Sequence, residues 1–245
     1  MSRIAIVSAM HEELRALLPL LTDAQTVRRA GRDHHLGSID GHAVVLVLCG
    51  IGKVAAATTT AVLLDGLDVN ALLLTGVAGG LGAGVRVGDV VIGRSLLQHD
   101  MDASPLFPRY EVPLTGRSHF PADTALCAAL AAGCQRVLQA PHPALAGFGI
   151  DAPRLHEGLV ISGDRFVATA LESQALRTAL PEALAVEMEG AAVAQVCADF
   201  GRPFGVVRTI SDRADDAAHV DFPRFIAEVA AEFSRDIVRA TLAQL

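Results

Sequence analysis

Aromatic residues are scarce in this chain of 245 residues: they make up 4% of it, and tryptophan is absent. Alanine, valine and leucine dominate instead, which suits a sheet covered by helices better than an aromatic-rich sandwich. Hydrophobic residues reach 51% and charged residues only 19%, a balance that excludes extended disorder. We therefore expect one large α/β domain that spans residues 1–245.

Basic clusters and paired cysteines are also missing. The formal net charge is −7, and no basic patch is present to attract a nucleic acid or an anionic membrane. The apolar start of the chain is interrupted at His11-Glu12-Glu13, too early for a signal peptide. The four cysteines form no Cys-x-x-Cys pair, so we expect reduced thiols in a cytoplasmic protein.

Several familiar catalytic motifs are absent as well. The nine histidines give no His-Glu-x-x-His motif and no Cys/His cluster, and we predict neither a metal nor another cofactor. No Gly-x-Ser-x-Gly elbow occurs. The Gly52-Lys53 pair does not belong to a phosphate-binding Walker loop, because Val47 and Val54 occupy positions that need Gly and Ser or Thr.

What the sequence does contain is an alternation of short apolar runs with helical patterns. The predicted strands are residues 3–9, 43–49, 69–75, 89–92, 158–162, 184–186 and 204–210. The predicted helices are residues 12–21, 53–64, 170–180, 190–200 and 222–242. This order predicts a mixed, largely parallel sheet flanked by helices. Thr169 and Glu172 form a capping-box pattern, and residues 135–156 are expected to be a loop or surface insertion.

Acidic residues follow several predicted strands directly, where ligands gather in open α/β sheets. Glu13 comes after the first strand, Glu187 and Glu189 after a later one, and Asp212 after the last. Each alone is equally well explained as a helix cap or a surface carboxylate. Their shared position at strand ends favours a binding site.

With these residues in place, the chain resembles the 5′-methylthioadenosine/S-adenosylhomocysteine nucleosidases, a branch of the purine nucleoside phosphorylase superfamily. The resemblance covers nearly the whole length and implies the three-layer fold of nucleoside phosphorylases. It rests on five segments in register: Ala9-Met10-His11-Glu12-Glu13, Gly50-Ile51-Gly52-Lys53-Val54-Ala55-Ala56, Thr75-Gly76-Val77-Ala78-Gly79-Gly80, Ser162-Gly163-Asp164-Arg165-Phe166, and Val186-Glu187-Met188-Glu189 followed by Arg208-Thr209-Ile210-Ser211-Asp212.

The resemblance implies hydrolysis of the bond between adenine and a 5′-thio-ribose, within methionine salvage. Three catalytic residues follow from it: Glu13 deprotonates the attacking water, Asp212 protonates N7 of the purine, and Glu189 binds the ribose hydroxyls. The other implied site residues are Glu187 and Met188 at the sugar, Phe166 and Val167 at adenine, Ser211 beside Asp212, Arg208 among the carboxylates, and Met10, Ile51, Phe107 and Phe222 around the 5′-alkylthio group.

These residue types suit the chemistry on physical grounds. Cleavage passes through an oxocarbenium-like state, and adenine leaves poorly unless N7 gains a proton. An acid near the base and a second carboxylate near the water divide this work, as in inverting glycosidases. A dry pocket can raise the pKa of the acid, and carboxylates near the anomeric carbon stabilise the developing cation.

Two departures and three alternatives remain open at this point. Val77 stands where relatives of this kind usually carry Ser or Thr, and His11 replaces an acidic residue. A phosphorylase, a futalosine-type nucleosidase and a non-catalytic nucleoside-binding relative are the competing interpretations. The expected partner is a small adenine nucleoside. The resemblance also implies a homodimer, in which we expect Phe222 to complete the pocket of the neighbouring subunit.

Overall fold

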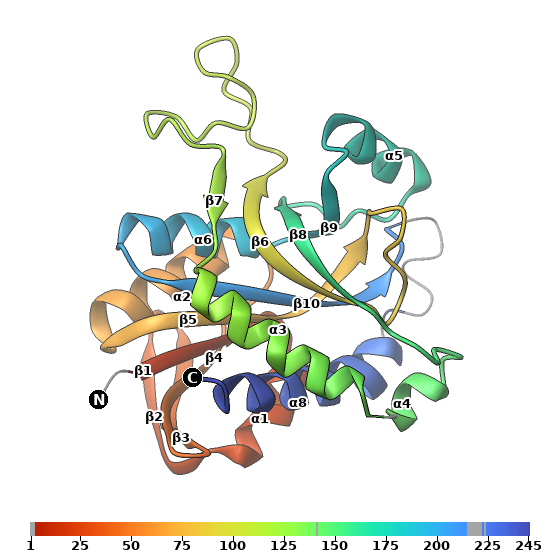
Figure 1. Cartoon of the computed structure of the whole chain (residues 1–245). Coiled ribbons are helices and arrows are strands. Elements are labelled where there is room, and N and C mark those ends of the chain that lie inside the picture. The colour runs from red at the N-terminus through yellow and green to blue at the C-terminus, as the bar shows by residue number, and fades with distance from the viewer. Residues whose placement is uncertain (1–2, 141, 215–221, 223) are drawn as a thin grey trace.

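A single ten-stranded sheet runs through the chain (Figure 1). The computed structural model describes residues 3–140, 142–214, 222 and 224–245. The strands are β1 (Arg3–Ser8), β2 (Thr22–Arg29), β3 (Arg32–Ile39), β4 (His42–Leu48), β5 (Val69–Gly80), β6 (Val90–Gln98), β7 (His119–Pro121), β8 (Leu155–Ser162), β9 (Ala183–Glu187) and β10 (Phe204–Asp212).

The strand order brings distant segments together. Nine strands follow the order β10-β6-β8-β9-β5-β1-β4-β3-β2, and β7 pairs with β6 beside this order. A further pairing of β10 with β5 closes β10, β6, β8, β9 and β5 into a ring. The pairs β1–β4, β1–β5, β5–β10, β6–β8 and β8–β9 are parallel, whereas β9–β5, β6–β10 and the β2–β3–β4 hairpins are antiparallel. The predicted mixed sheet is confirmed. The carboxyl ends of β1, β5 and β10 meet at one edge.

Helices cover the sheet on both faces. They are α1 (His11–Leu17), the 3₁₀ turn η1 (Leu18–Leu20), α2 (Lys53–Gly66), α3 (Thr124–Leu138), α4 (Pro143–Ala146), α5 (Ala170–Ala179), α6 (Gly190–Asp199), the π-helical turn η2 (Ile226–Ala230) and α8 (Ala231–Leu242). Helices α2 and α6 pack together, while α1 and α3 both pack on α8 (Figure 1). No helix in the described part of the chain is long and apolar enough to cross a membrane.

The strand β1 shows why an unbroken apolar run forms the centre of this sheet. Ala5 and Val7 pack in the cluster that includes residues of α2 and α6. Ile6, which points to the other face, packs with residues of α1 and α8. A strand covered on both faces needs apolar residues at every position and not at alternate ones. The same rule explains why the predictions at residues 3–9, 43–49 and 69–75 are confirmed.

The elements that the sequence did not predict have no clear apolar pattern. The strand β2 is almost wholly exposed and carries no apolar alternation. Helix α3 buries Leu126, Cys127, Leu130 and Cys134 in an alanine-rich sequence whose periodicity is weak. The segment 135–156 is not one loop, because it contains the end of α3, the short α4 and the first residues of β8. The Thr169 capping box is confirmed, since its side chain accepts a hydrogen bond from the Glu172 backbone.

Candidate active site

One cavity of about 330 Å³ opens at the edge where β1, β5 and β10 end. Most of its lining comes from residues at or just beyond strand ends, as expected for a ligand site in an α/β sheet. The residues that line it are Ala9, Met10, Glu13, Ile51, Val77, Ala78, Gly79, Arg165, Phe166, Val167, Val186, Glu187, Met188, Glu189, Arg208, Ser211, Asp212 and Phe222.

Glu13 enters this cavity from the first turn of α1. The carboxylate reaches back to the start of its own helix, where the Met10 N–H donates to its Oε2 at 3.2 Å. Glu13 is fully buried, and its Oε1 has no hydrogen-bond partner among the described residues. One oxygen is therefore fixed by the helix, and the other is available to a ligand.

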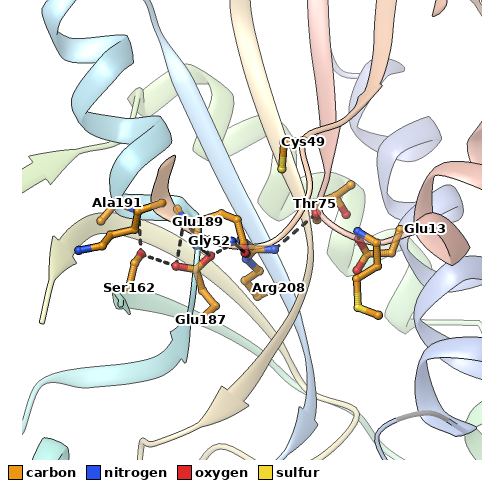
Figure 2. A network of polar contacts seen from close by, with 12 residues as sticks. Glu13, Cys49, Gly52, Thr75, Ser162, Glu187, Glu189, Ala191 and Arg208 are labelled. Atoms are coloured by element: carbon orange, nitrogen blue, oxygen red, sulfur yellow. Dashed lines mark hydrogen bonds and ion pairs between the residues drawn. The ribbon is translucent and has the colours of Figure 1, made fainter. Parts of the chain in front are cut away.

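A second group of charges surrounds Arg208 on β10 (Figure 2). Its Nη2 donates to Glu187 and, at 3.4 Å, to Glu189. Glu187 also accepts hydrogen bonds from the Ser162 hydroxyl and from the backbone of Glu189 and Gly190. These contacts fix Arg208 and Glu187 before any ligand binds.

The position of Arg208 also depends on a glycine. Any side chain at Gly76 on β5 would overlap the Arg208 guanidinium and would lie 3.1 Å from Glu13 Oε1. The guanidinium thus lies against the β5 backbone, beside the free oxygen of Glu13. Glu189 is held from another side, since the Gly52 N–H donates to its Oε1 at 2.8 Å.

This burial changes the acidity of the carboxylates. Desolvation raises the pKa of Glu13 to about 7, opposed by the positive charge of Arg208. Desolvation and the neighbouring Glu187 raise the pKa of Glu189 to about 7. Burial disfavours the charged form of Arg208, but Glu187, Glu189 and Glu13 outweigh it and raise its pKa. Carboxylates that change charge near neutral pH are suited to moving protons.

Asp212 ends β10 at another part of the cavity. The Ala214 N–H donates to its Oδ1 at 2.7 Å, and the Ser211 hydroxyl donates to its Oδ2 at 2.8 Å. A side chain at Gly79 on β5 would lie 3.1 Å from Asp212 Oδ1. Gly76 and Gly79 are three residues apart on β5, so the points that Glu13 and Asp212 approach are about 10 Å apart.

Two aromatic rings border the cavity near its opening. Phe166 and Phe222 meet edge to face, with ring centroids 5.6 Å apart. Phe166 is 45% exposed, while the neighbouring Val167 is buried. Within one chain, Phe222 lines the pocket and contacts Phe166, and its completion of a neighbouring subunit's pocket stays a prediction. The chain returns to this edge before η2, which the helical pattern alone did not show.

Phe107 is the one predicted site residue that the structure does not bring to the cavity. It lies in the long connection between β6 and β7, which projects beyond the sheet in Figure 1. Leu106 and Leu114 in the same connection are 84% and 90% exposed. Phe107 is half-buried within this projection and does not reach the cavity of its own chain, so its place at the alkylthio group stays a prediction.

The cavity also contains residues to which the sequence alone assigned no role, although all lie in the segments that carry the family resemblance: Ala9, Ala78, Gly79, Arg165 and Val186. Four of them are small or apolar and belong to strand ends, so their side chains carry no chemical signal of a site. Arg165 pairs with Glu172 at the surface. Within the described ranges, no three His, Cys, Asp or Glu side chains converge as a metal site.

Comparison with known proteins agrees with this arrangement. The family model described as "Phosphorylase superfamily" matches residues 3–243. A curated 5′-methylthioadenosine/S-adenosylhomocysteine nucleosidase from Colwellia psychrerythraea is 37% identical over 241 residues, which are 98% of this chain and 95% of the relative. The chain belongs to this nucleosidase family within the phosphorylase superfamily.

Two solved structures extend the comparison. The crystal structure of a nucleosidase from Colwellia psychrerythraea in complex with adenine superposes with a TM-score of 0.90 at 35% identity, covering 100% of this chain and 96% of the other. A futalosine hydrolase of Helicobacter pylori superposes with a TM-score of 0.85 at 30% identity, covering 100% and 98%. The three-layer fold is therefore shared by nucleosidases that are named for different substrates.

Proposed function

We propose that this protein hydrolyses the N-glycosidic bond of 5′-thio adenine nucleosides, methylthioadenosine and S-adenosylhomocysteine, to adenine and the free thio-ribose. The observation that carries the proposal is the pairing of Glu13 and Asp212 in one cavity, at separate points along β5. The spacing of about 10 Å between those points leaves room for a sugar and a water between the two carboxyl groups. The nucleosidases that this chain resembles supply the substrate class.

In this mechanism Glu13 is the base. Because its pKa is raised to about 7, it is substantially ionised at neutral pH and still basic enough to accept a proton from water. Its free Oε1 faces the cavity, where a water can be held between Glu13 and Arg208. The positive guanidinium keeps part of the carboxylate population ionised despite the burial.

The remaining roles divide between the sugar and the base. Glu189, fixed by the Gly52 N–H, binds the ribose hydroxyls beside Met188 and adds negative charge near the developing cation. Glu187 contributes by holding Arg208 in place. Asp212 donates a proton to N7 of adenine, positioned by the Ser211 hydroxyl.

The apolar parts of the cavity suit the rest of the nucleoside. Phe166 stacks on the adenine ring and the Val167 backbone binds its edge. Met10, Ile51 and Phe222 surround the 5′-alkylthio group. All three line the cavity, which gives the thioether an apolar environment.

Phosphate fits the same place poorly. A phosphorylase must hold a dianion beside the anomeric carbon, but here Glu13 and Glu189 present negative charge there. The Arg208 guanidinium is already engaged by Glu187 and Glu189. Val77 offers two methyl groups and no hydroxyl. Water is therefore the favoured nucleophile.

The deciding experiment is a nucleoside panel assayed for free base with and without phosphate. Methylthioadenosine should release adenine and free methylthioribose in phosphate-free buffer. Strict dependence on added phosphate, with a sugar 1-phosphate as product, would contradict the proposal. Futalosine belongs in the panel, because the structural likeness extends to a futalosine hydrolase.

We also propose a cytoplasmic homodimer acting in methionine salvage. All four cysteines are free and buried, which suits a reducing compartment. Ile51, Val54 and Leu106 are large apolar residues left exposed on this chain. Exposed apolar surface of this kind favours association with a second copy. A dimer mass in analytical ultracentrifugation is the expected result.

A further inference from the structure

Three charged residues next to the cavity form a closed ring of hydrogen bonds. Lys53, Asp100 and Asp164 follow different strands, β4, β6 and β8, and none of them lines the cavity. We propose that this ring fixes the adenine-stacking Phe166 and the ribose-binding Glu189 at the correct positions relative to each other. Its members are then positioning residues for nucleoside binding. The proposal rests on the proposed nucleosidase function.

Each member of the ring is bonded to the other two. The Lys53 ammonium donates to Asp100 Oδ1 at 2.6 Å. The Asp164 backbone N–H donates to Asp100 Oδ2 at 2.9 Å, and the Lys53 backbone N–H donates to Asp164 Oδ1 at 2.7 Å. The Lys53 ammonium also donates to Gln98 Oε1 at 3.0 Å, at the end of β6. Three loops that are remote in the sequence are thus joined through two side-chain carboxylates.

One side of the ring leads to the ribose. Lys53 is the first residue of α2, and its helix begins without a side-chain cap from its own N-cap residue, Gly52. The Asp164 carboxylate takes that place from another loop, which is also favourable for the helix dipole. The neighbouring Gly52 N–H donates to Glu189 at 2.8 Å. Fixing the start of α2 therefore fixes the hydrogen bond that orients Glu189.

The other side of the ring leads to adenine. Asp164 lies two residues before Phe166 in the connection between β8 and α5. Upstream of Phe166 this connection is attached by the Gly163 N–H to Glu187 and by the Asp164 N–H to Asp100. Downstream it is attached by the Thr169 cap of α5. Because Phe166 is half exposed, packing alone constrains its ring weakly, and the two attachments determine where it stands.

The Asp100 carboxyl of the ring is held in its ionised form. Burial opposes the charge on Asp100, but the Lys53 ammonium and the Asp164 N–H outweigh it and hold the pKa of that carboxyl below its ordinary value. Charge-assisted hydrogen bonds of this kind are stronger and more directional than neutral ones. Lys53 of the turn formed by residues 50–53 therefore binds Asp100 and not a phosphate.

Four variants separate positioning from simple structural support. Lys53→Met removes the ammonium but keeps an unbranched side chain of similar length, and Asp164→Ala removes the acceptor for the Lys53 N–H. Asp164→Asn keeps an oxygen at Oδ1 and should preserve the ring. Arg94→Met is the matched control, because the Arg94–Glu157 ion pair also joins β6 to β8 but contributes nothing to the cavity lining.

We expect Lys53→Met and Asp164→Ala to raise KM for methylthioadenosine about tenfold while kcat changes by less than about threefold, since ground-state binding is lost. The Kd for free adenine should rise in parallel. Asp164→Asn and Arg94→Met should stay close to the parental values. A parental KM and adenine Kd in both disruptive variants would overturn the proposal, and so would a tenfold rise of KM in Arg94→Met.

A second readout does not depend on activity. Amide hydrogen exchange of residues 163–168 should be faster in Lys53→Met and Asp164→Ala than in the parent, and unchanged in Arg94→Met. Unchanged exchange in the two disruptive variants would overturn the ring as a positioning device. If the parental protein released no base from any nucleoside, the proposed function would fail, whereas the exchange comparison would still test the ring.

Discussion

The two ends of the cavity are built differently. At the sugar end, Glu13 and Arg208 are 0% and 1% exposed, and their charges are linked to further carboxylates and to backbone N–H groups. At the base end, Phe166 is 45% exposed and meets Phe222 at the opening. Side chains are therefore held rigidly beside the sugar, where charge develops during the reaction. They are held less tightly at the opening, where the adenine ring must enter.

This contrast follows from what each end does. Electrostatic stabilisation works when the charges are oriented before the reaction, because no reorganisation is then needed in the transition state. The cost is the burial of charge: desolvation raises the pKa of Glu13 and of Glu189 to about 7, although the Arg208 guanidinium opposes it. The base end needs only apolar area and one acid, and adenine itself can complete its packing.

The largest effects are expected from the two carboxyl groups that handle protons. Glu13→Gln and Asp212→Asn should each lower kcat about 10²-fold or more, the usual scale for a positioned base or acid. Both changes are nearly isosteric, and Asn at 212 can still accept the Ala214 N–H, so the fold should survive. Adenine release under saturating substrate measures kcat, and circular dichroism checks the fold. A variant with near-parental turnover would show that its residue has no catalytic role.

Glu189→Gln should have a smaller effect on the same assay. It keeps one acceptor for the Gly52 N–H but loses the negative charge beside the sugar. We expect kcat/KM to fall by less than it does in Glu13→Gln and Asp212→Asn. The reason is that stabilisation of the oxocarbenium-like sugar is weakened while Glu13 still activates the water. A loss as large as that of Glu13→Gln would instead mean that Glu189 takes part in deprotonating the water.

The acidic residues at both ends of the cavity could be predicted from the sequence. Glu13 and Glu189 at the sugar and Asp212 at the base line the cavity, and each lies at or just beyond the end of an apolar strand, the clearest local signal. The ring of β5, β10, β6, β8 and β9 could not be predicted, since the pairing of β10 with β5 depends on contacts between residues far apart in the chain.

Phe107 and Phe222 are the site residues that the sequence located least well, for one physical reason. Both are aromatic residues outside the strands, and their location depends on the path of a connection and not on periodicity. Phe222 begins a helical segment in which Phe225 and Phe233 are buried, but a helical pattern says nothing about which pocket the first turn meets. Almost wholly exposed strands such as β2 could not be predicted for a related reason, because they bury too few side chains to produce an apolar pattern.

Phe222→Ala tests the opening of the cavity. Loss of the ring should raise KM for methylthioadenosine about tenfold, through lost burial of the alkylthio group, and should affect plain adenosine much less. Mixing Phe222→Ala with Glu13→Gln subunits sharpens the test. If Phe222 serves its own chain, the mixture contains no complete site and gains no activity. Recovery of activity on mixing would mean that the ring crosses to a partner.

The smallest expected effect is the pH dependence of folding stability that Glu13 causes. It reports the charge state of this one carboxyl group at the sugar end. Glu13 has a pKa of about 7 in the folded chain against 4.5 as its ordinary value, so the folded state binds its proton more tightly. Stability is therefore lost as pH rises from 4.5 through about 7, and is constant above that. His34 and His99, whose pKa values burial lowers, act in the opposite direction, because their protonation in the unfolded chain removes stability as pH falls.

Comparing Glu13→Gln with the parent cancels the histidines, which both proteins contain. Glutamine stays neutral at every pH, so the melting temperature of the variant minus that of the parent should be close to zero near about pH 5 and should grow towards about pH 8. Thermal unfolding scans across this range measure the difference. A difference that does not change with pH would mean that Glu13 is ionised throughout, and that Arg208 offsets the desolvation of the carboxylate completely.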